Sequence, residues 1–106
     1  MTNCAAYLGG IVLACTLMQK TEATNAATPA AVAAGRQLFL MNCAHCHAQD
    51  ATGDEGPDLH GLKKSDARIA RIIGEGIQGE MPRFWSKLQE SDVKLLIQYL
   101  RSLPAS

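Results

Sequence analysis

The sequence predicts an all-α fold of three to four short helices within residues 29–106. Thr28 followed by Pro29 marks a helix start, because a threonine side chain caps the first turn and proline fits the first helical position. A second helix is indicated near the C-terminus by an apolar stripe at positions i, i+3, i+4 and i+7. The stripe consists of Val93, Leu96, Ile97 and Leu100. We find no convincing strand pattern in this region.

A long glycine-rich loop follows the first helix. The helix is expected to run from Pro29 to about Asn42, and residues 48–64, rich in Gly and Asp, form the loop. Such loops in so small a domain indicate a functional segment or a bound ligand. The whole chain has only two Phe, two Tyr and one Trp, and a domain of this size buries little apolar surface. A large, flat, apolar cofactor would supply the core material that the sequence lacks.

The second half of the domain contains two more predicted helices. Ser65 can cap a short helix through Ile73, which Gly74 ends. A second glycine-rich loop, with the sequence GEGIQGEMP, follows this helix. The last helix is expected to open at Ser91–Asp92 and to close at Pro104, which cannot continue a helix.

The charge of the chain is balanced, with ten Lys and Arg residues against ten Asp and Glu residues. The charges are scattered along the chain and form no long block. A nucleic-acid-binding protein needs an excess of basic residues on one face, so we expect no nucleic-acid partner.

Residues 1–28 are predicted to be an export signal or membrane anchor followed by a flexible linker. Residues 5–18 are almost wholly apolar and uncharged, but shorter than the roughly 20 residues of a membrane-spanning helix. Residues 1–4 lack the Lys or Arg that usually precedes the apolar stretch of a signal sequence. The alternative is that the apolar stretch is a buried helix of the domain. Residues 16–30 are rich in Thr and Ala without apolar periodicity, which is typical of a linker.

The residues Val12–Leu13–Ala14–Cys15 resemble a bacterial lipobox, in which cleavage before the cysteine leaves that cysteine lipid-modified. Small-residue pairs near Ala23 and Ala26 are competing cleavage sites for a signal peptidase. Either way, the segment predicts a periplasmic or otherwise extracytoplasmic protein. The lipobox further predicts that the protein is anchored to a membrane.

The sequence CAHCH at residues 43–47 places two thiols and two imidazoles within one helical turn. A thioredoxin-like dithiol normally follows a strand, and here the motif follows a helix. A structural zinc site needs a second pair of ligands some distance on, where only His60 is present. The third chemistry is attachment of a c-type haem, whose signature is C-x-x-C-H.

Covalent haem attachment explains the spacing of this motif best. Two thiolates, from Cys43 and Cys46, would add to vinyl groups on neighbouring pyrroles of one haem c. The next residue, His47, then lies over the iron and is predicted to be its proximal ligand. His45 occupies a variable position of the motif and is expected to be exposed.

Four further segments accompany CAHCH in a definite order. They are GRQLF at 35–39, GPDLHGL at 56–62, GEMP at 79–82 and YLRSLP at 99–104. With these segments the chain resembles the class I c-type cytochromes, a family of monohaem proteins, from Pro29 to Pro104. The resemblance implies a small cytochrome c-like fold in which the helices wrap around the haem. It also implies that the first and last helices cross, with Gly35 allowing close approach to the face bearing Tyr99.

The resemblance further implies roles for Pro57 and Met81. The carbonyl of Pro57 would accept a hydrogen bond from the ring of His47, and Met81 would be the second axial ligand of the iron. Among the four methionines, Met81 alone lies in a glycine-flanked loop far enough from His47 to cover the opposite haem face. Met41 is expected to pack in the core. The alternative for Met81 is a loop residue that merely fills a gap.

Other residues near these motifs have weaker predictions. Phe84 and Trp85 are expected to form walls of the haem pocket, and the Trp85 indole could donate to a propionate. His60 is expected to be a surface loop residue, with a propionate contact as the alternative. A basic cluster is expected to be a solvated helix face, with docking of an acidic partner as the alternative. The cluster consists of Lys63, Lys64, Arg68 and Arg71.

The predicted function is one-electron transfer by a haem c with His and Met ligands, without enzyme activity. The partners are expected to be redox proteins, and the protein to be a monomer or a subunit of a redox complex. One alternative is an electron-accepting haem subunit of a larger oxidoreductase. Another is a ligand-binding haem enzyme or sensor, which would require that Met81 does not bind iron.

Overall fold

The computed structural model describes residues 7–8, 11–12 and 27–105. Two two-residue strands, β1 (Tyr7–Leu8) and β2 (Ile11–Val12), pair antiparallel. The rest of the predicted export segment, including the lipobox cysteine Cys15, lies outside the described residues. Within the described part of the chain, no helix has the length and apolar character needed to cross a membrane.

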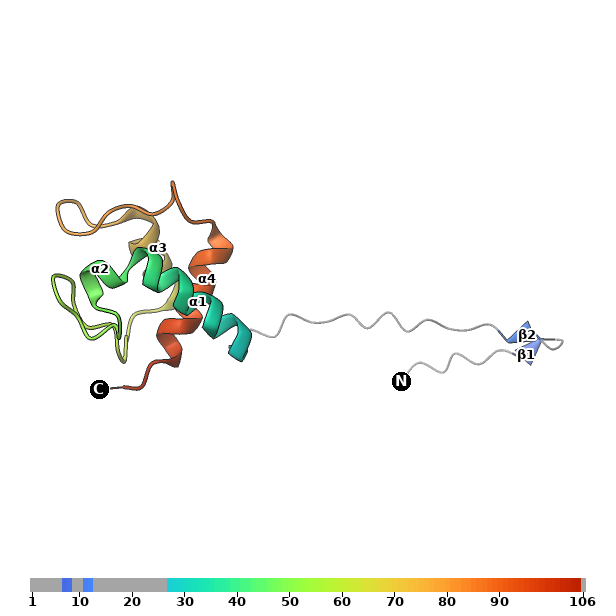
Figure 1. Ribbon diagram of the computed structural model, residues 1–106. Helices are drawn as coiled ribbons and strands as arrows, with labels where there is room; N and C mark the ends of the chain where they lie inside the picture. The colour runs from blue at the N-terminus through green and yellow to red at the C-terminus, as the bar shows by residue number, and fades with distance from the viewer. Residues whose placement is uncertain (1–6, 9–10, 13–26, 106) are drawn as a thin grey trace.

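Four helices make up the domain shown in Figure 1, and the predicted all-α fold is confirmed there. They are α1 (Pro29–Asn42), α2 (Ala44–His47), α3 (Asp66–Glu75) and α4 (Glu90–Ser102). The helix starts follow the predicted caps: the side chains of Thr28 and Ser65 accept hydrogen bonds from backbone amides of α1 and α3.

Two predicted helix boundaries were wrong. Helix α3 does not end at Gly74 but continues to Glu75, and Gly76 terminates it with a φ of 69°. A glycine adopts this left-handed conformation without a steric penalty, which is why Gly76 and not Gly74 is the stop. Helix α4 begins at Glu90, one residue before the predicted Ser91, because Gln89 and Asp92 form a reciprocal capping box around its first turn.

Helices α1 and α4 cross closely, as expected, at Gly35. A Cβ atom at this position would lie 2.1 Å from the carbonyl oxygen of Leu95 and 2.8 Å from Cβ of Tyr99. Only a residue without a side chain lets the two backbones approach this closely. One turn further along α1, the ring of Phe39 packs against that of Tyr99 with centroids 5.3 Å apart. This crossing forms the rigid base of the domain.

The remaining buried side chains come from the later elements and close the core above that base. They include Ile69, Ile73, Phe84, Leu88, Val93, Leu96, Ile97 and Leu100. Helix α3 packs on α4, and two long loops complete the domain: residues 48–65 between α2 and α3, and residues 76–89 between α3 and α4. Figure 1 shows these two loops, yellow-green and orange, on opposite sides of α2.

Candidate haem-binding site

The CAHCH segment forms a tight turn at the end of α1. The amide of Cys43 donates to the Phe39 carbonyl at 2.7 Å, and the amides of Cys46 and His47 both donate to the Cys43 carbonyl, at 3.1 and 3.0 Å. Cys43 therefore ends α1 and starts α2. Both cysteines are free thiols and partly buried. The turn gathers two thiols and two imidazoles within five successive residues around a short helix, and of the two rings only that of His47 is buried.

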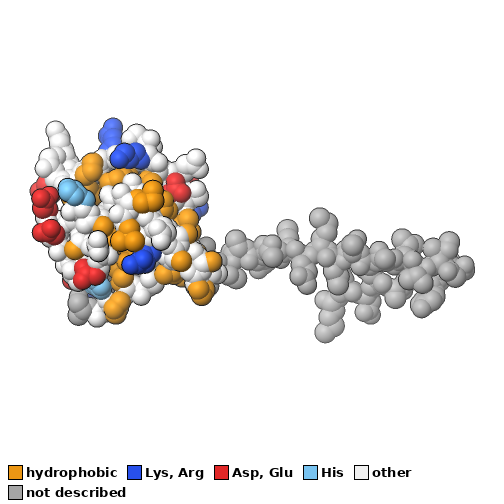
Figure 2. Space-filling model, viewed as in Figure 1, with side chains coloured by type: hydrophobic (Ala, Val, Ile, Leu, Met, Phe, Trp, Pro, Cys, Tyr) orange, Lys and Arg blue, Asp and Glu red, His pale blue; other side chains and the backbone are white. Residues whose placement is uncertain are grey.

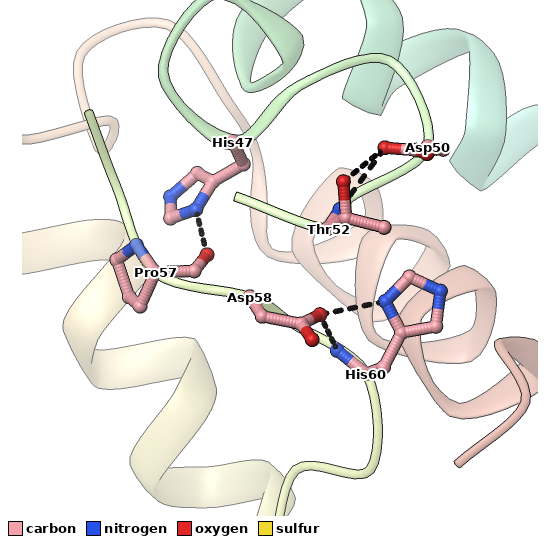
Figure 3. Close-up of polar contacts among 6 residues, drawn as sticks. All are labelled: His47, Asp50, Thr52, Pro57, Asp58 and His60. Carbon is pink, nitrogen blue, oxygen red and sulfur yellow. Dashed lines mark hydrogen bonds and ion pairs between the residues drawn. The ribbon is translucent and has the colours of Figure 1, made fainter. Parts of the chain in front are cut away.

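The ring of His47 is buried and has a fixed orientation. Its Nδ1 atom lies 2.8 Å from the carbonyl oxygen of Pro57, as Figure 3 shows, and the residue is only 9 % exposed. Because a carbonyl can only accept, Nδ1 must carry the proton and donate it. The lone pair of the neutral ring is then on Nε2, the atom that faces away from Pro57. A histidine prepared in this way is suited to bind a metal ion.

Gly56 lies directly against the His47 ring. A Cβ atom on Gly56 would come within 2.7 Å of Cε1 and 2.8 Å of Nδ1 of His47. The same loop is tied to α2 by two backbone bonds, from the Gly56 amide to the Cys46 carbonyl at 2.7 Å and from the Gly53 amide to the His47 carbonyl at 2.9 Å. The loop thus holds the imidazole from behind, and only glycine at position 56 leaves room for the ring.

The environment of Cys43 disfavours the thiolate form of its side chain. Burial, followed by the nearby Cys46 thiol, raises the pKa of Cys43 from 9.0 to about 11. A raised pKa disfavours the thiolate, the form that both a redox dithiol and haem attachment use, so this shift by itself selects neither chemistry. The described residues also hold no group of three or more His, Cys, Asp or Glu side chains that could bind a metal ion. The donor set of two thiols and one oriented imidazole fits covalent haem attachment best.

Met81 lies in the loop between α3 and α4, where it pairs with Ile77 to close a tight turn. Its amide donates to the Ile77 carbonyl at 2.8 Å, and the Ile77 amide donates back to the Met81 carbonyl at 2.9 Å. Gly79 turns the chain between them with a φ of 78°. Met81 is partly buried and lines an open cavity of about 520 Å³, together with Glu75 and other residues of the range 77–83.

The structure separates the two aromatic residues that follow the Met-Pro pair. Phe84 is 6 % exposed and belongs to the core, whereas Trp85 is 46 % exposed and lies against α3 at Gly74. Met41 was expected in the core, and this prediction was wrong: the residue is 76 % exposed. It lies near the C-terminal end of α1. Figure 2 shows apolar side chains exposed over much of the viewed face of the domain.

The two remaining histidines have different environments. His45 is exposed, as predicted. His60 is not the free surface residue that we expected: its side chain is 12 % exposed, and its Nδ1 atom lies 2.7 Å from Asp58 Oδ1 (Figure 3). The sequence D-x-H carried a signal for this contact, because an Asp side chain commonly bonds groups two residues on, and the same carboxylate accepts from the His60 amide at 2.9 Å.

The basic cluster is exposed along the start of α3 and the loop before it, as a solvated face requires. Arg71 pairs with Glu75 one turn later on α3. Arg101 of α4, which sequence reasoning missed, is more firmly held. Its guanidinium pairs with Asp66 at 2.9 Å and donates to the carbonyls of Leu62 and Lys64, so it ties the end of the 48–65 loop to α4.

Comparison with known proteins identifies relatives of this chain. The family model described as "Cytochrome C oxidase, cbb3-type, subunit III" matches residues 30–100. The cbb3-type cytochrome c oxidase subunit CcoP of Rubrivivax gelatinosus is 39% identical over 83 residues, which cover 71% of this chain and 27% of that protein. A cytochrome c-553-like protein of Synechocystis sp. is 37% identical over 71 residues, which cover 65% of this chain and 66% of the other.

A solved structure agrees with these sequence relatives. The crystal structure of the c-type cytochrome SorU from Sinorhizobium meliloti superposes with a TM-score of 0.59 at 28% identity, covering 74% of this chain and 97% of that one. The chain therefore spans about a quarter of the CcoP protein that it matches and nearly all of a small c-type cytochrome.

Proposed function

The chain belongs to the c-type cytochrome family, by the match of residues 30–100 to the cbb3-type subunit III model, and on that premise we propose that it transfers single electrons. Family membership implies one haem c with its iron, covalently bound. When bound, the haem supplies one-electron chemistry, as its iron alternates between the ferric and ferrous states. Cys43 and Cys46 would form the thioether bonds. The observation that carries this proposal is the buried His47 ring, whose Nδ1 donates to the Pro57 carbonyl and whose Nε2 is left as a ligand atom.

We assign His47 and Met81 as the two axial ligands. The Pro57 carbonyl and the close contact of Gly56 restrain the His47 ring in one orientation and one tautomer. The paired backbone bonds between Ile77 and Met81 restrain the loop that presents the thioether. A restrained ligand pair favours electron transfer, because neither oxidation state then requires much movement of the protein. Thioether ligation also favours the reduced state and raises the potential.

With both His47 and Met81 bound, the iron would have no position left for a substrate, so we propose an electron-transfer protein without enzyme activity of its own. The competing function, a ligand-binding haem enzyme or sensor, requires that Met81 is labile. Carbon monoxide added to the reduced native protein separates the two. We expect slow or negligible binding, and rapid, complete binding would overturn the electron-carrier proposal.

Substitution of Met81 tests the ligand assignment directly. Met81→Ala should abolish the sulfur-to-iron charge-transfer band of the oxidised protein and lower its reduction potential, because thioether stabilisation of ferrous iron is lost. Gln78→Ala, at an exposed position of the same loop, is the matched control and should keep the band. If the band survives in Met81→Ala, Met81 is not the ligand.

A second candidate function is that of a fixed electron-accepting subunit in a larger oxidoreductase complex. It is favoured by the match to the cbb3-type subunit III model and to the oxidase subunit of Rubrivivax gelatinosus. The two candidates share the haem chemistry and differ in mobility. Purification from the native membrane at low salt distinguishes them: a partner at constant stoichiometry indicates a fixed subunit, and its absence indicates a mobile carrier.

The site of action is proposed to be extracytoplasmic, with the N-terminal segment as a membrane anchor. This proposal rests on the apolar residues 5–18 and on the lipobox-like residues before Cys15. The partners would be redox proteins that approach from the same side of the membrane.

A further inference from the structure

The indole of Trp85 lies directly against α3 at Gly74. A Cβ atom at position 74 would lie 1.8 Å from Cε2 and 2.1 Å from Nε1 of Trp85. These separations are far below any van der Waals contact. The ring therefore occupies the volume that any other residue at position 74 would need.

Gly74 is not required by the conformation of its own backbone. It lies inside α3, two residues before the C-terminal cap, and it is absent from the positions with positive φ. Glycine in a helix interior is less favourable than alanine because it loses more conformational entropy on folding. In the described structure, glycine is needed at position 74 because the indole of Trp85 fills the space that a side chain would take.

This contact lies at the base of the loop that carries Met81. The amide of Trp85 donates to the Gly74 carbonyl at 3.2 Å, and the amide of Phe84 approaches the carbonyls of Ile73 and Gly74, both at 3.2 Å. Phe84 is buried beside them. Residues 76–83 therefore form a loop that leaves α3 after Glu75 and returns to α3 where Phe84 and Trp85 bond its carbonyls.

The loop has a second restraint nearer to Met81. Gly76, which caps helix α3, packs against residues 81–83 of the returning loop, and a Cβ atom at position 76 would lie 2.5 Å from the Met81 carbonyl oxygen. The Ile77–Met81 bridge lies next to it. Met81 is held in a fixed position only when both restraints are in place: the Gly74–Trp85 contact, which ties the ends of the loop together, and the Ile77–Met81 bridge, which orders its turn.

We propose that Gly74 and Trp85 are positioning residues for Met81: the indole closes the loop onto α3 and keeps the thioether from leaving the iron. This inference rests on the proposed role of Met81 as a ligand. It also explains why a large aromatic side chain that remains 46 % exposed is found at position 85. The buried part of the indole lies against α3, and this contact holds the loop closed.

Imidazole binding to the oxidised holoprotein measures how firmly Met81 is held. Exogenous imidazole must displace the thioether, so its apparent affinity rises as the closed loop loses stability. About half of Trp85 is buried, and loss of this burial should tighten imidazole binding by about tenfold in Trp85→Ala. Gly74→Ala should have an effect at least as large, because its methyl group expels the ring. Ser86→Ala, exposed in the same segment, is the matched control and should be unchanged.

The double variant Gly74→Ala/Trp85→Ala decides between a specific contact and general damage. Without the indole, the methyl group at position 74 meets no ring, and alanine even favours the helix. The double variant should therefore bind imidazole no more tightly than Trp85→Ala alone. If the two effects multiply instead, Gly74 acts independently of Trp85 and the proposal is overturned. Far-UV circular dichroism checks that each variant retains its helices.

Two further outcomes separate this inference from the proposed function. If the wild-type protein lacks the sulfur-to-iron band, Met81 is not a ligand and both ideas fail together. If the wild type has the band but Trp85→Ala binds imidazole as weakly as the wild type, the ligand assignment stands and the positioning role is refuted. If Gly74→Ala does not accumulate as holoprotein, Trp85→Ala alone decides the question by the same tenfold criterion.

Discussion

Replacing Gly56 by alanine is predicted to raise the reduction potential of the protein. The new methyl carbon would lie 2.7 Å from Cε1 and 2.8 Å from Nδ1 of His47, if nothing moved. Real contacts of a Cβ atom essentially never fall below 3.0 Å, so the ring or the loop must shift. Gly56 has no positive φ, and the backbone itself therefore accepts alanine. The perturbation is confined to the contact between the loop and the imidazole.

The shift should weaken the bond between His47 Nδ1 and the Pro57 carbonyl, now 2.8 Å long. A typical hydrogen bond contributes about 0.5–1.5 kcal/mol. If His47 binds the iron as proposed, this bond makes the imidazole a more basic ligand, which stabilises ferric iron. One-electron potentials change by about 59 mV for each tenfold change in equilibrium constant, or each 1.4 kcal/mol. Complete loss of a bond that serves mainly the ferric state would therefore raise the potential by about 20–65 mV.

A spectroelectrochemical titration of the purified holoprotein measures this shift. The charge-transfer band of the sulfur ligand must be recorded in parallel, because loss of Met81 would lower the potential and mask the effect. Glu55→Ala is the control, since Glu55 is exposed in the same loop, and it should titrate like the wild type apart from the small effect of one lost surface charge. A potential that is unchanged or lowered in Gly56→Ala, with the band intact, would refute the role assigned to the Pro57 carbonyl.

Two other predictions concern the scaffold and the N-terminal segment. Gly35→Ala should reduce the free energy of unfolding by about 1–3 kcal/mol, because the methyl group overpacks the contact with Leu95 and Tyr99; each kcal/mol lowers the melting temperature of a domain of this size by roughly 4–8 °C. Thermal unfolding checks this, and a melting temperature equal to that of Gln37→Ala on the exposed face of α1 would contradict it. Cys15→Ser should release the protein from membranes on cell fractionation if a lipid on this cysteine is the anchor; continued tight attachment would indicate an uncleaved signal anchor instead.

Local signals were sufficient to predict a large part of the fold. The start of α1 at Pro29 and the start of α3 after Ser65 depend on caps that are contiguous in the sequence. The turn of CAHCH is equally local, because its hydrogen bonds join residues three or four positions apart. The apolar stripe of α4 needed only the helical period. These features are encoded by neighbours along the chain, so sequence reasoning could reach them.

The features that sequence reasoning missed depend on contacts between elements. Gly74 looked like a helix stop, but Trp85 from the returning loop requires a glycine inside the helix. Met41 has an apolar side chain of the kind usually found in a core, but the crossing of α1 with α4 buries a different face of α1. Arg101 has the pattern of an ordinary basic residue near a helix end, and only the folded chain brings Asp66 to it.

Glycine is required in this domain for two reasons, and only one of them can be recognised from the sequence; both apply to Gly76, because a Cβ atom there would also lie 2.5 Å from the Met81 carbonyl oxygen. Gly76 and Gly79 have positive φ and occur where a helix ends and a hairpin turns, so the turn signals of the sequence point to them. Gly35, Gly56 and Gly74 have ordinary backbones and are needed because another element occupies the place of a side chain. In each case the occupant is tied to function: a crossing helix that supports the fold, the ring of His47, and the indole beneath the Met81 loop. Substitution of Gly56 or Gly74 should therefore disturb the surroundings of the proposed iron ligands while leaving the helices intact, substitution of Gly35 should lower the stability of the helix crossing, and substitution of Gly76 or Gly79 should change the turns themselves.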